Sequence, residues 1–273
     1  MVYLQVILMA ILQGLTEFLP VSSSGHLVFL NELFTRFGWR EIEEPLMLSV
    51  LLHCASLLAI ICYYWRPLWR MLLGKDPHLF RLLIVGTIPV GIVGILVKVF
   101  FEAPFEAVMS SVQITGMMML LTAILLIFAQ KLSMQNPHEL QKLGLRRNLK
   151  TLTWKRALAI GCIQALAVLP GLSRSGSTIT AGLFAGLKRQ DAGAFSFLLA
   201  VPAVGAASLV EILKLLKDGS AGNVGLLPLG VGFLVCFIVS LFALTLLVRL
   251  LRSRSIGLFS FYLIPLGMIL LLL

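Results

Sequence analysis

Two short segments, far apart in the chain, combine hydroxyl, carboxylate, imidazole and guanidinium groups with glycine and proline. The first reads QGLTEFLPVSSSGH (residues 13–26) and the second reads QALAVLPGLSRSGST (residues 164–178). Both lie in apolar surroundings, where an ionisable side chain is costly and is a functional candidate by default. The ionisable residues of the apolar segments are few: Glu17, His26, His53, Arg174 and, near the end of its segment, Glu211. Three of them belong to these two segments, so we expect the chemistry there.

The second segment has the composition of a phosphate site. Arg174 lies between Ser173 and Ser175 and is followed by Gly176. A guanidinium binds phosphate oxygens in a bidentate manner, and hydroxyls and backbone N–H groups add further donors. A helix that starts after this loop would point its positive end at the same anion. The competing interpretation is an arginine that forms a purely structural salt bridge with Glu17.

The first segment offers nucleophiles and a base within one turn, namely Ser22, Ser23 and His26. A serine near a histidine base could attack phosphorus, or His26 could be the nucleophile itself. Equally, His26 could activate water or protonate the leaving group. The sequence leaves these alternatives open. The competing structural interpretation is a set of small residues at a helix crossing, capped by a histidine.

Glu17 and Gln13 are four residues apart and therefore share one helical face. A carboxylate beside an anion site is repulsive unless a cation intervenes or the acid carries a proton. Glu17 is therefore expected either to help hold a divalent metal or to transfer protons, and oxygen ligands favour Mg²⁺ or Ca²⁺ over zinc. For His53, which lies in a long apolar segment, two interpretations stay open: it lines a cavity together with Gln13, or it packs as a polar residue.

The elements that carry these segments are membrane helices. Of the 273 residues, 59% are hydrophobic and 12% are charged, and the mean hydropathy is +1.00, whereas a soluble domain carries about 25% charged residues. Apolar runs of spanning length recur along the chain and leave no room for a separate soluble domain. We therefore expect a single membrane domain over residues 1–273. The expected spans are Leu46–Tyr64, Leu82–Phe101, Val108–Gln130, Phe195–Leu216, Leu226–Val248 and Ile256–Leu273.

The net charge of +10 lies mainly in short segments between these spans. The basic segments, which the positive-inside rule places in the cytoplasm, are Trp65–Arg81, Gln130–Arg156 and Arg249–Arg254. The loops Phe101–Glu106 and Lys217–Asn223 carry little basic charge and are expected outside. This distribution argues against nucleic-acid binding.

The chain also contains an internal repeat. Gln13, Ser22, Ser24 and Gly25 each recur as the same residue type 151 positions later. Each half reads as one broken segment followed by three spans, so the second copy must enter the membrane from the opposite side. The predicted fold is therefore an all-α integral membrane protein with two inverted-topology repeats, each a re-entrant broken helix pair plus three transmembrane helices. We place repeat one at about 1–130, a cytoplasmic basic linker at about 131–156 and repeat two at about 157–273, with the site between the broken segments.

These segments resemble the two signature motifs of the bacterial undecaprenyl-diphosphatase family, which is associated with bacitracin resistance. Residues 86–89 (GTIP) and 195–202 (FSFLLAVP) also match it, in order. The resemblance implies hydrolysis of undecaprenyl diphosphate to undecaprenyl phosphate and phosphate, with a divalent-metal requirement. It also implies an active site on the periplasmic side of the bacterial cytoplasmic (inner) membrane, where the reaction recycles the carrier lipid for peptidoglycan synthesis.

Carried over by position, the resemblance assigns roles to individual residues. Glu17 belongs to the acidic motif, Ser23 matches a candidate nucleophile, His26 the catalytic histidine and Arg174 the diphosphate-binding arginine. The remaining polar positions of the diphosphate site are Ser22, Ser173, Ser175 and Thr178. The chain departs from many relatives in having Ser49, Ala194 and Gln13 at positions that are often acidic.

Other function classes fit less well. Lipid phosphatases of the acid-phosphatase type need a histidine after the Ser-Arg element, and none follows Arg174. A polyprenyl-phosphate flippase or ion-coupled transporter would use the same inverted-repeat site, but transport does not require the Ser/His combination. The expected partners are a polyprenyl diphosphate and membrane lipids, with no nucleic acid. The sequence does not fix the oligomeric state, and a homodimer is one option.

Overall fold

The computed structural model describes residues 2–38, 46–134, 148–218, 225–253 and 256–273, and its regular elements are helices. The first half holds α1 (Val2–Thr16), α2 (Ser23–Arg36), α3 (Leu46–Tyr63), α4 (Trp65–Leu72), α5 (Pro77–Phe100), α6 (Glu102–Ser110) and α7 (Val112–Met134). The second half holds η1 (Leu149–Thr151), α9 (Trp154–Leu166), α10 (Arg174–Phe184), α11 (Arg189–Asp218), α12 (Leu226–Ser253) and α13 (Leu258–Leu272). The predicted all-α class is confirmed.

Four helices, α5, α7, α11 and α12, are long and apolar enough to cross a membrane, judged by length and composition. A fifth span is added if α3 and α4 count as one, although the chain bends by 81° between them. The sixth predicted span forms α13, whose 15 residues fall short of the roughly 20 that a straight crossing needs. The chain is therefore a multi-pass membrane protein.

The connections differ in part from the prediction. The segment that begins at Phe101 was expected to be a loop, but α6 starts at Glu102 and continues to Ser110. Its proline, Pro104, stands in the first turn, where a missing N–H breaks no helical hydrogen bond. Much of the predicted basic linker (residues 135–147) and of the second outer loop (residues 219–224) lies outside the described residues.

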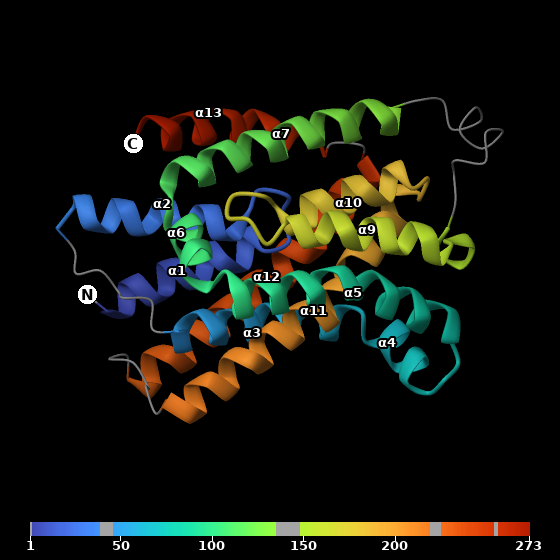
Figure 1. Cartoon of the computed structure of the whole chain (residues 1–273), viewed down its shortest axis with the longest axis horizontal. Helices are drawn as coiled ribbons and strands as arrows, with labels where there is room; N and C mark the ends of the chain where they lie inside the picture. Colours follow the sequence, from blue (N-terminus) through green and yellow to red (C-terminus); the bar gives the residue numbers. More distant parts are fainter. Residues whose placement is uncertain (1, 39–45, 135–147, 219–224, 254–255) are drawn as a thin grey trace.

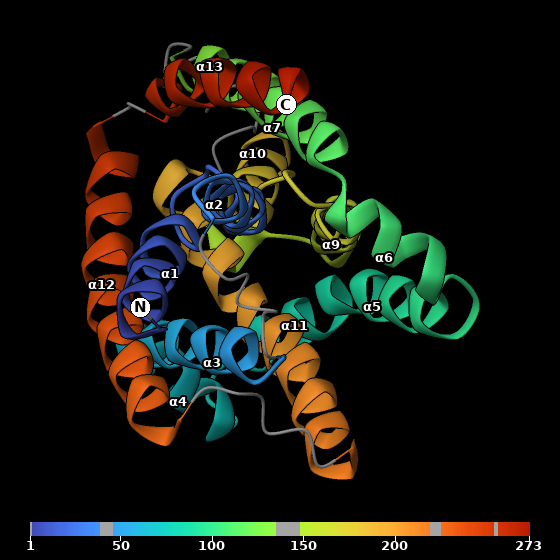
Figure 2. The same cartoon turned by 90° about the vertical axis from the view of Figure 1, so that its left-hand side faces the viewer.

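Two helical hairpins occupy the centre of the molecule. In Figure 1, α1 and α2 come from one end and α9 and α10 from the other, and their turns meet in the middle. The end-on view in Figure 2 shows α12, α5 and the α7–α13 pair around these hairpins. Helices α1 and α9 pack on equivalent long helices, α1 along α12 and α9 along α5, while α7 pairs with α13 and α3 with α11.

Small residues allow these helices to approach closely. A Cβ atom on Gly161 of α9 would lie 2.1 Å from the carbonyl oxygen of Gly86 in α5, so neither helix could keep its place with a larger residue there. Phe18 of the first turn packs edge-on against Phe197 of α11, with ring centroids 5.8 Å apart. Close helix packing through small residues is typical of membrane proteins.

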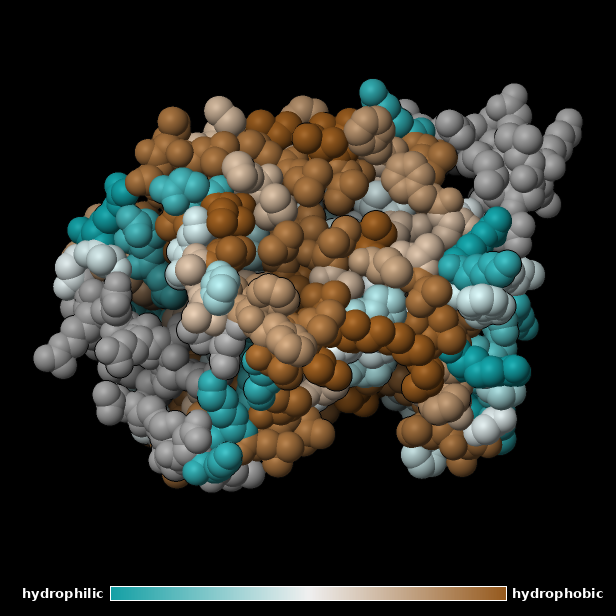
Figure 3. All heavy atoms as spheres, in the orientation of Figure 1, coloured by the Kyte–Doolittle hydropathy of each residue, from teal (hydrophilic) through white to brown (hydrophobic). Residues whose placement is uncertain are grey.

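The surface agrees with a membrane environment. In Figure 3 hydrophobic residues cover most of the visible face, and hydrophilic ones gather toward its two ends. Large apolar side chains, including Ile88, Ile95 and Phe242, are exposed on the spanning helices. An exposed apolar surface of this extent fits contact with lipid.

Candidate functional site

The first central turn joins α1 to α2. Pro20 interrupts the helix, and α2 begins at Ser23. Ser22 is its N-cap, since the side-chain oxygen accepts a hydrogen bond from the backbone N–H of Gly25 at 3.2 Å. Ser22 also has a φ of 69°, the one positive value at a non-glycine position among the residues described. The turn therefore keeps a serine in a conformation that favours glycine.

The second central turn joins α9 to α10, which begins at Arg174. Ser173 caps this helix in the same way, by accepting from the backbone N–H of Gly176 at 3.1 Å, and its φ is −63°. Here the left-handed conformation belongs to Gly171, with a φ of 85°. A Cβ atom at that position would lie 2.1 Å from the carbonyl oxygen of Thr115 in α7, so the turn requires glycine.

The two turns contact each other through equivalent serines. Ser24 Oγ of the first turn accepts from the backbone N–H of Gly171 at 3.4 Å. Its counterpart 151 positions later, Ser175, donates to the carbonyl oxygen of Leu19 at 3.2 Å. Each copy thus holds the other in place, as expected for one site built from both segments.

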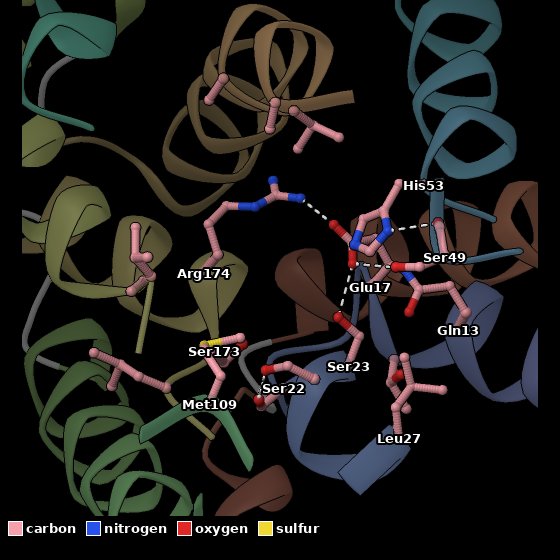
Figure 4. A pocket seen from close by; sticks show the side chains of 18 of the residues that line it. Gln13, Glu17, Ser22, Ser23, Leu27, Ser49, His53, Met109, Ser173 and Arg174 are labelled. Atoms are coloured by element: carbon pink, nitrogen blue, oxygen red, sulfur yellow. Dashed lines mark hydrogen bonds and ion pairs between the residues drawn. The ribbon is translucent and has the colours of Figure 1, made fainter. Parts of the chain in front are cut away.

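An ion pair forms the polar centre of the site. Glu17 Oε1 of the first turn pairs with Arg174 Nη2 of the second. Glu17 Oε2 accepts from Gln13 Nε2 at 3.1 Å and from Ser23 Oγ at 2.8 Å, as Figure 4 shows. The structural salt bridge weighed as an alternative is thus present. It does not use all of the guanidinium, because Nη1 of Arg174 is buried without a partner.

This ion pair borders a cavity of about 670 Å³. The polar groups of its wall are Gln13, Thr16, Glu17, Ser22, Ser23, Ser24, Asn31, Ser49, His53, Ser110, Gln164, Ser173, Arg174, Ser208 and Glu211. The apolar wall is formed by Leu27, Val28, Val90, Met109, Ala167, Val168, Leu172, Ala203, Val204 and Ala207. The cavity therefore has room for a polar head group next to an apolar chain.

Most of the predicted site residues line this cavity. They include Gln13 and His53, for which a position in the cavity wall was one of two interpretations. The ring of His53 is oriented by its Nδ1–H, which donates to the carbonyl oxygen of Ser49 at 2.8 Å. Ser49, a position at which the family resemblance implies an acid in many relatives, lies in the same wall. The departure from the family pattern therefore falls inside the site.

Three of the predicted residues lie behind the cavity wall: His26, Ser175 and Thr178. His26 is 3% exposed, and both ring nitrogens are engaged, Nδ1 with the carbonyl oxygen of Ser22 at 2.6 Å and Nε2 with the hydroxyl of Tyr262 at 2.8 Å. The structure does not bring His26 to the cavity. The ring of Tyr262 also stacks with the imidazole, so one residue makes both a ring contact and a hydrogen bond with His26.

Thr178 acts on the backbone of α10 instead of on the cavity. Its hydroxyl donates to the carbonyl oxygen of Arg174 at 2.7 Å and lies 2.5 Å from Ser196 Oγ of α11. Thr178 thus ties the first turn of α10 to α11. It supports Arg174 without facing the cavity.

Sequence reasoning missed several residues of the site, among them Gln164, Thr122 and Tyr262. Gln164 lines the cavity, and its match with Gln13 in the repeat was the signal that could have found it. Thr122 of α7 holds the second turn, accepting from the backbone N–H of Ser173 at 3.1 Å and donating to the carbonyl oxygen of Gly171 at 3.2 Å. Tyr262 reaches His26 from α13, 236 positions away. For Thr122 and Tyr262 no local pattern gives a signal.

Several buried polar atoms of the cavity residues have no hydrogen-bond partner. They are Gln13 Oε1, both side-chain polar atoms of Gln164, and Arg174 Nη1. An unsatisfied buried group costs roughly 1–3 kcal/mol, so such atoms are retained where a ligand or water completes them. The donors of Arg174 and Gln164 suit an anion, whereas the oxygen of Gln13 suits a cation or a donor.

The same donor set can be tested against a metal ion. In the part of the chain that the structure describes, no cluster of three or more His, Cys, Asp or Glu side chains is present. Gln13 nevertheless contacts Glu17 through its amide nitrogen Nε2, and the other polar atom of that amide is the free oxygen Oε1. These two oxygen groups fit a hard cation such as Mg²⁺ or Ca²⁺ that takes its other ligands from water and phosphate.

Comparisons with known proteins match most of the chain. The model of the family described as bacitracin resistance protein BacA matches residues 6–269. The undecaprenyl-diphosphatase of Rhodopirellula baltica is 37% identical over 99% of this chain and 97% of its own. The undecaprenyl-diphosphatase of Myxococcus xanthus is 36% identical over 99% of this chain and 88% of its own, and undecaprenyl-diphosphatase 3 of Bacillus cereus is 36% identical over 99% and 97%.

Proposed function

The chain belongs to the bacitracin resistance protein BacA family, and from that premise we propose that it hydrolyses undecaprenyl diphosphate to undecaprenyl phosphate and inorganic phosphate. The observation that carries the proposal is the Glu17–Arg174 ion pair, which joins both central turns at a cavity that Ser23 also lines. A guanidinium for the phosphate and a hydroxyl in contact with a carboxylate are the groups that phosphoryl transfer to a serine needs.

We infer that the diphosphate replaces Glu17 as the partner of Arg174. The unpartnered Nη1 and the paired Nη2 together offer the two parallel donors that a phosphate accepts. Because α10 begins at Arg174, its positive end adds to the attraction. Beyond the polar end, side chains such as Val90, Val168 and Val204 offer an apolar wall for the first isoprene units.

In the proposed reaction Ser23 Oγ attacks the terminal phosphorus. Glu17 Oε2, which accepts the Ser23 hydroxyl at 2.8 Å, takes the proton. The bond from this phosphorus to the bridging oxygen breaks, and undecaprenyl phosphate leaves with that proton on the former bridging oxygen. Water then attacks the phosphoserine, gives one proton through Glu17 to Ser23 Oγ, and releases inorganic phosphate.

The choice of Ser23 among the open alternatives is supported by position. Ser23 lines the cavity and contacts the acid, whereas His26 is buried behind Ser22. Attack by water activated at Glu17 would use the same cavity but would leave no phosphoserine. Trapping of a phosphorylated Ser23 by rapid acid quench therefore separates these two routes.

We also propose that a divalent cation, Mg²⁺ or Ca²⁺, takes part. Glu17 and the free side-chain oxygen of Gln13 would hold it. When bound, the ion would supply positive charge that offsets the charge of the diphosphate. The expectation is a loss of phosphate release with chelator and its return with Mg²⁺ or Ca²⁺.

The topology is part of the proposal. We propose that the two hairpins belong to inverted repeats of about 1–130 and 157–273, supported by their equivalent serine caps and by their entry from opposite ends. With basic segments inside, the site faces the periplasm of the inner membrane and would recycle the carrier lipid for peptidoglycan, which confers bacitracin resistance. A homodimer stays a prediction that the molecular mass in detergent would test.

The second candidate function is lipid or ion transport, which the paired broken helices favour. Phosphate release from undecaprenyl diphosphate by detergent-purified protein separates the two, because detergent leaves no compartments to transport between. We expect metal-dependent release by the wild type and its loss in Ser23→Ala. The control is Thr151→Ala, which removes an exposed hydroxyl outside the cavity. No release by folded wild-type protein that binds the lipid would overturn the enzyme and leave a carrier.

A further inference from the structure

We propose that Tyr262 is a positioning residue of the site: through His26 it holds the backbone of Ser22, so that Ser23 meets Glu17. The inference rests on the proposed hydrolysis by Ser23 and gives His26 a role other than nucleophile or base. It begins from a contact between α13 and α2, two helices at opposite ends of the chain.

The hydrogen bonds assign the proton of His26. A carbonyl oxygen can only accept, so Nδ1, which lies 2.6 Å from the carbonyl oxygen of Ser22, must carry a hydrogen. In the neutral ring Nε2 is then the acceptor, and the Tyr262 hydroxyl donates to it at 2.8 Å. The two rings also stack, with centroids 5.6 Å apart and planes inclined by 15°. Tyr262 thereby fixes both the tautomer and the plane of the imidazole.

The carbonyl that His26 holds belongs to the strained residue of the turn. Ser22 has φ 69° and ψ 102°, and the same carbonyl oxygen accepts from the backbone N–H of His26 at 3.3 Å. A strained conformation of this kind persists where surrounding contacts over-determine it. Because Ser23 follows directly as the first residue of α2, the orientation of this peptide sets where its hydroxyl points.

Tyr262 is itself fixed by the packing of α13 on α7. A Cβ atom on Gly116 would lie 2.8 Å from the carbonyl oxygen of Gly267, so the two helices are in close contact there. Ser260 adds a hydrogen bond to the carbonyl oxygen of Ala123 at 3.0 Å. Helix α7 in turn holds Gly171 of the second turn through Thr122. The α7–α13 pair therefore supports both turns at once.

Substitutions of His26 test the proposal against acid–base or nucleophilic catalysis. In His26→Asn the amide N–H takes the place of Nδ1–H and can still bond the Ser22 carbonyl, but the side chain can neither accept a proton nor attack phosphorus. We expect His26→Asn to keep a kcat about tenfold or more above that of His26→Ala, since one buried hydrogen bond is restored. His26→Asn protein that is folded, binds the lipid and is as inactive as His26→Ala would overturn the proposal, because the imidazole itself would then be required.

Removal of the tyrosine hydroxyl tests the hydrogen bond between Tyr262 and His26. Tyr262→Phe keeps the stacked ring, so we expect kcat to fall about three- to tenfold with KM unchanged, as for one lost hydrogen bond. The matched control is Tyr3→Phe on the exposed part of α1. An unchanged kcat in Tyr262→Phe would overturn the proposal.

A ¹⁵N spectrum of histidine-labelled full-length protein gives a readout that needs no hydrolysis. Of the four histidines, His26 is identified by the signal that disappears in His26→Asn. We expect its Nε2 signal to be that of a hydrogen-bonded, unprotonated nitrogen and to shift in Tyr262→Phe. Failure of the proposed function would show as no phosphate release with this signal as expected, whereas a signal from protonated Nε2 would overturn the positioning role alone.

Discussion

The two central turns share a serine N-cap but present different side chains to Glu17. In each, a serine caps the following helix at the N–H three residues on, and in each the next side chain contacts Glu17. That side chain is Ser23 in the first copy and Arg174 in the second, which are equivalent positions in the repeat. In the proposed reaction, the hydroxyl that attacks and the guanidinium that binds therefore stand at equivalent helix starts of the two copies.

The turns differ in how they are held. The first keeps a serine at positive φ and is supported by His26 and Tyr262, whereas the second places Gly171 at positive φ against Thr115 of α7. The repeat therefore sets the positions of Ser23 and Arg174 at the two helix starts, whereas contacts from outside the repeat motif hold the backbone of each turn. Variants of the two turns separate these two contributions.

The largest effect is expected from removal of the guanidinium. Arg174→Ala deletes the anion-binding group and leaves Glu17 buried without its partner, so phosphate release should fall about 10³-fold. Arg174→Lys keeps the charge but loses the paired donors, so its phosphate release should lie between that of the wild type and that of Arg174→Ala. The control is Arg66→Ala on the exposed part of α4. Activity of Arg174→Ala within threefold of the wild type would remove the second turn from the site.

The sequence predicted well the features that the two turns have in common. Proline, glycine and serine at equivalent positions identify the two turns, because these residues break and cap helices through local chemistry. Buried charge at Glu17 and Arg174 stands out for the same reason, since little else in the apolar segments ionises. Both turns were therefore predictable, together with Glu17, Ser23 and Arg174, which line the cavity between them.

The supports of the turns were not predictable from sequence. Thr122 and Tyr262 lie on apolar helices whose composition indicates only a membrane environment, and their partners are far away in the chain. For the same reason His26 could not be placed behind the cavity wall: its ring is turned by a hydroxyl from α13. Contacts that depend on how helices pack leave no local pattern.

A second test concerns the glycine of the second turn. Gly171→Ala places a Cβ 2.1 Å from a backbone oxygen of α7 at a φ of 85°, so we expect a loss of roughly 2–5 kcal/mol in unfolding free energy. The thermal midpoint in detergent, followed by tryptophan fluorescence, measures it. Gly91→Ala is the matched control, since a Cβ there meets open space. Equal midpoints for the two variants would contradict the rigid second turn.

A smaller effect is expected at the glutamines that share one repeat position. Gln13→Glu adds a carboxylate beside Glu17 and should lower the half-saturating Mg²⁺ concentration about tenfold, since affinity rises with ligand charge. Gln164→Glu, on the opposite copy, should instead raise KM for the anionic substrate. Titration of phosphate release with Mg²⁺ and with lipid separates the two effects. An identical response of both variants would show that the copies do not divide cation and anion binding.

The smallest effect should differ in sign between the two copies. Ser22→Gly removes a cap, which costs only a few tenths of a kcal/mol for glycine, but relieves a positive φ worth about 1 kcal/mol or more. Either glycine adds backbone entropy to the unfolded chain, but Ser173→Gly removes the cap at a φ of −63°, where no relief of strain offsets that entropy. Thermal midpoints in one detergent should therefore rise slightly for Ser22→Gly and fall slightly for Ser173→Gly. Ser22→Gly should at the same time keep most of kcat, because glycine adopts the same φ without strain and retains the carbonyl that His26 holds. A fall in both midpoints would mean that the positive φ of Ser22 costs no free energy in the folded protein. The two copies would then differ in their side chains alone.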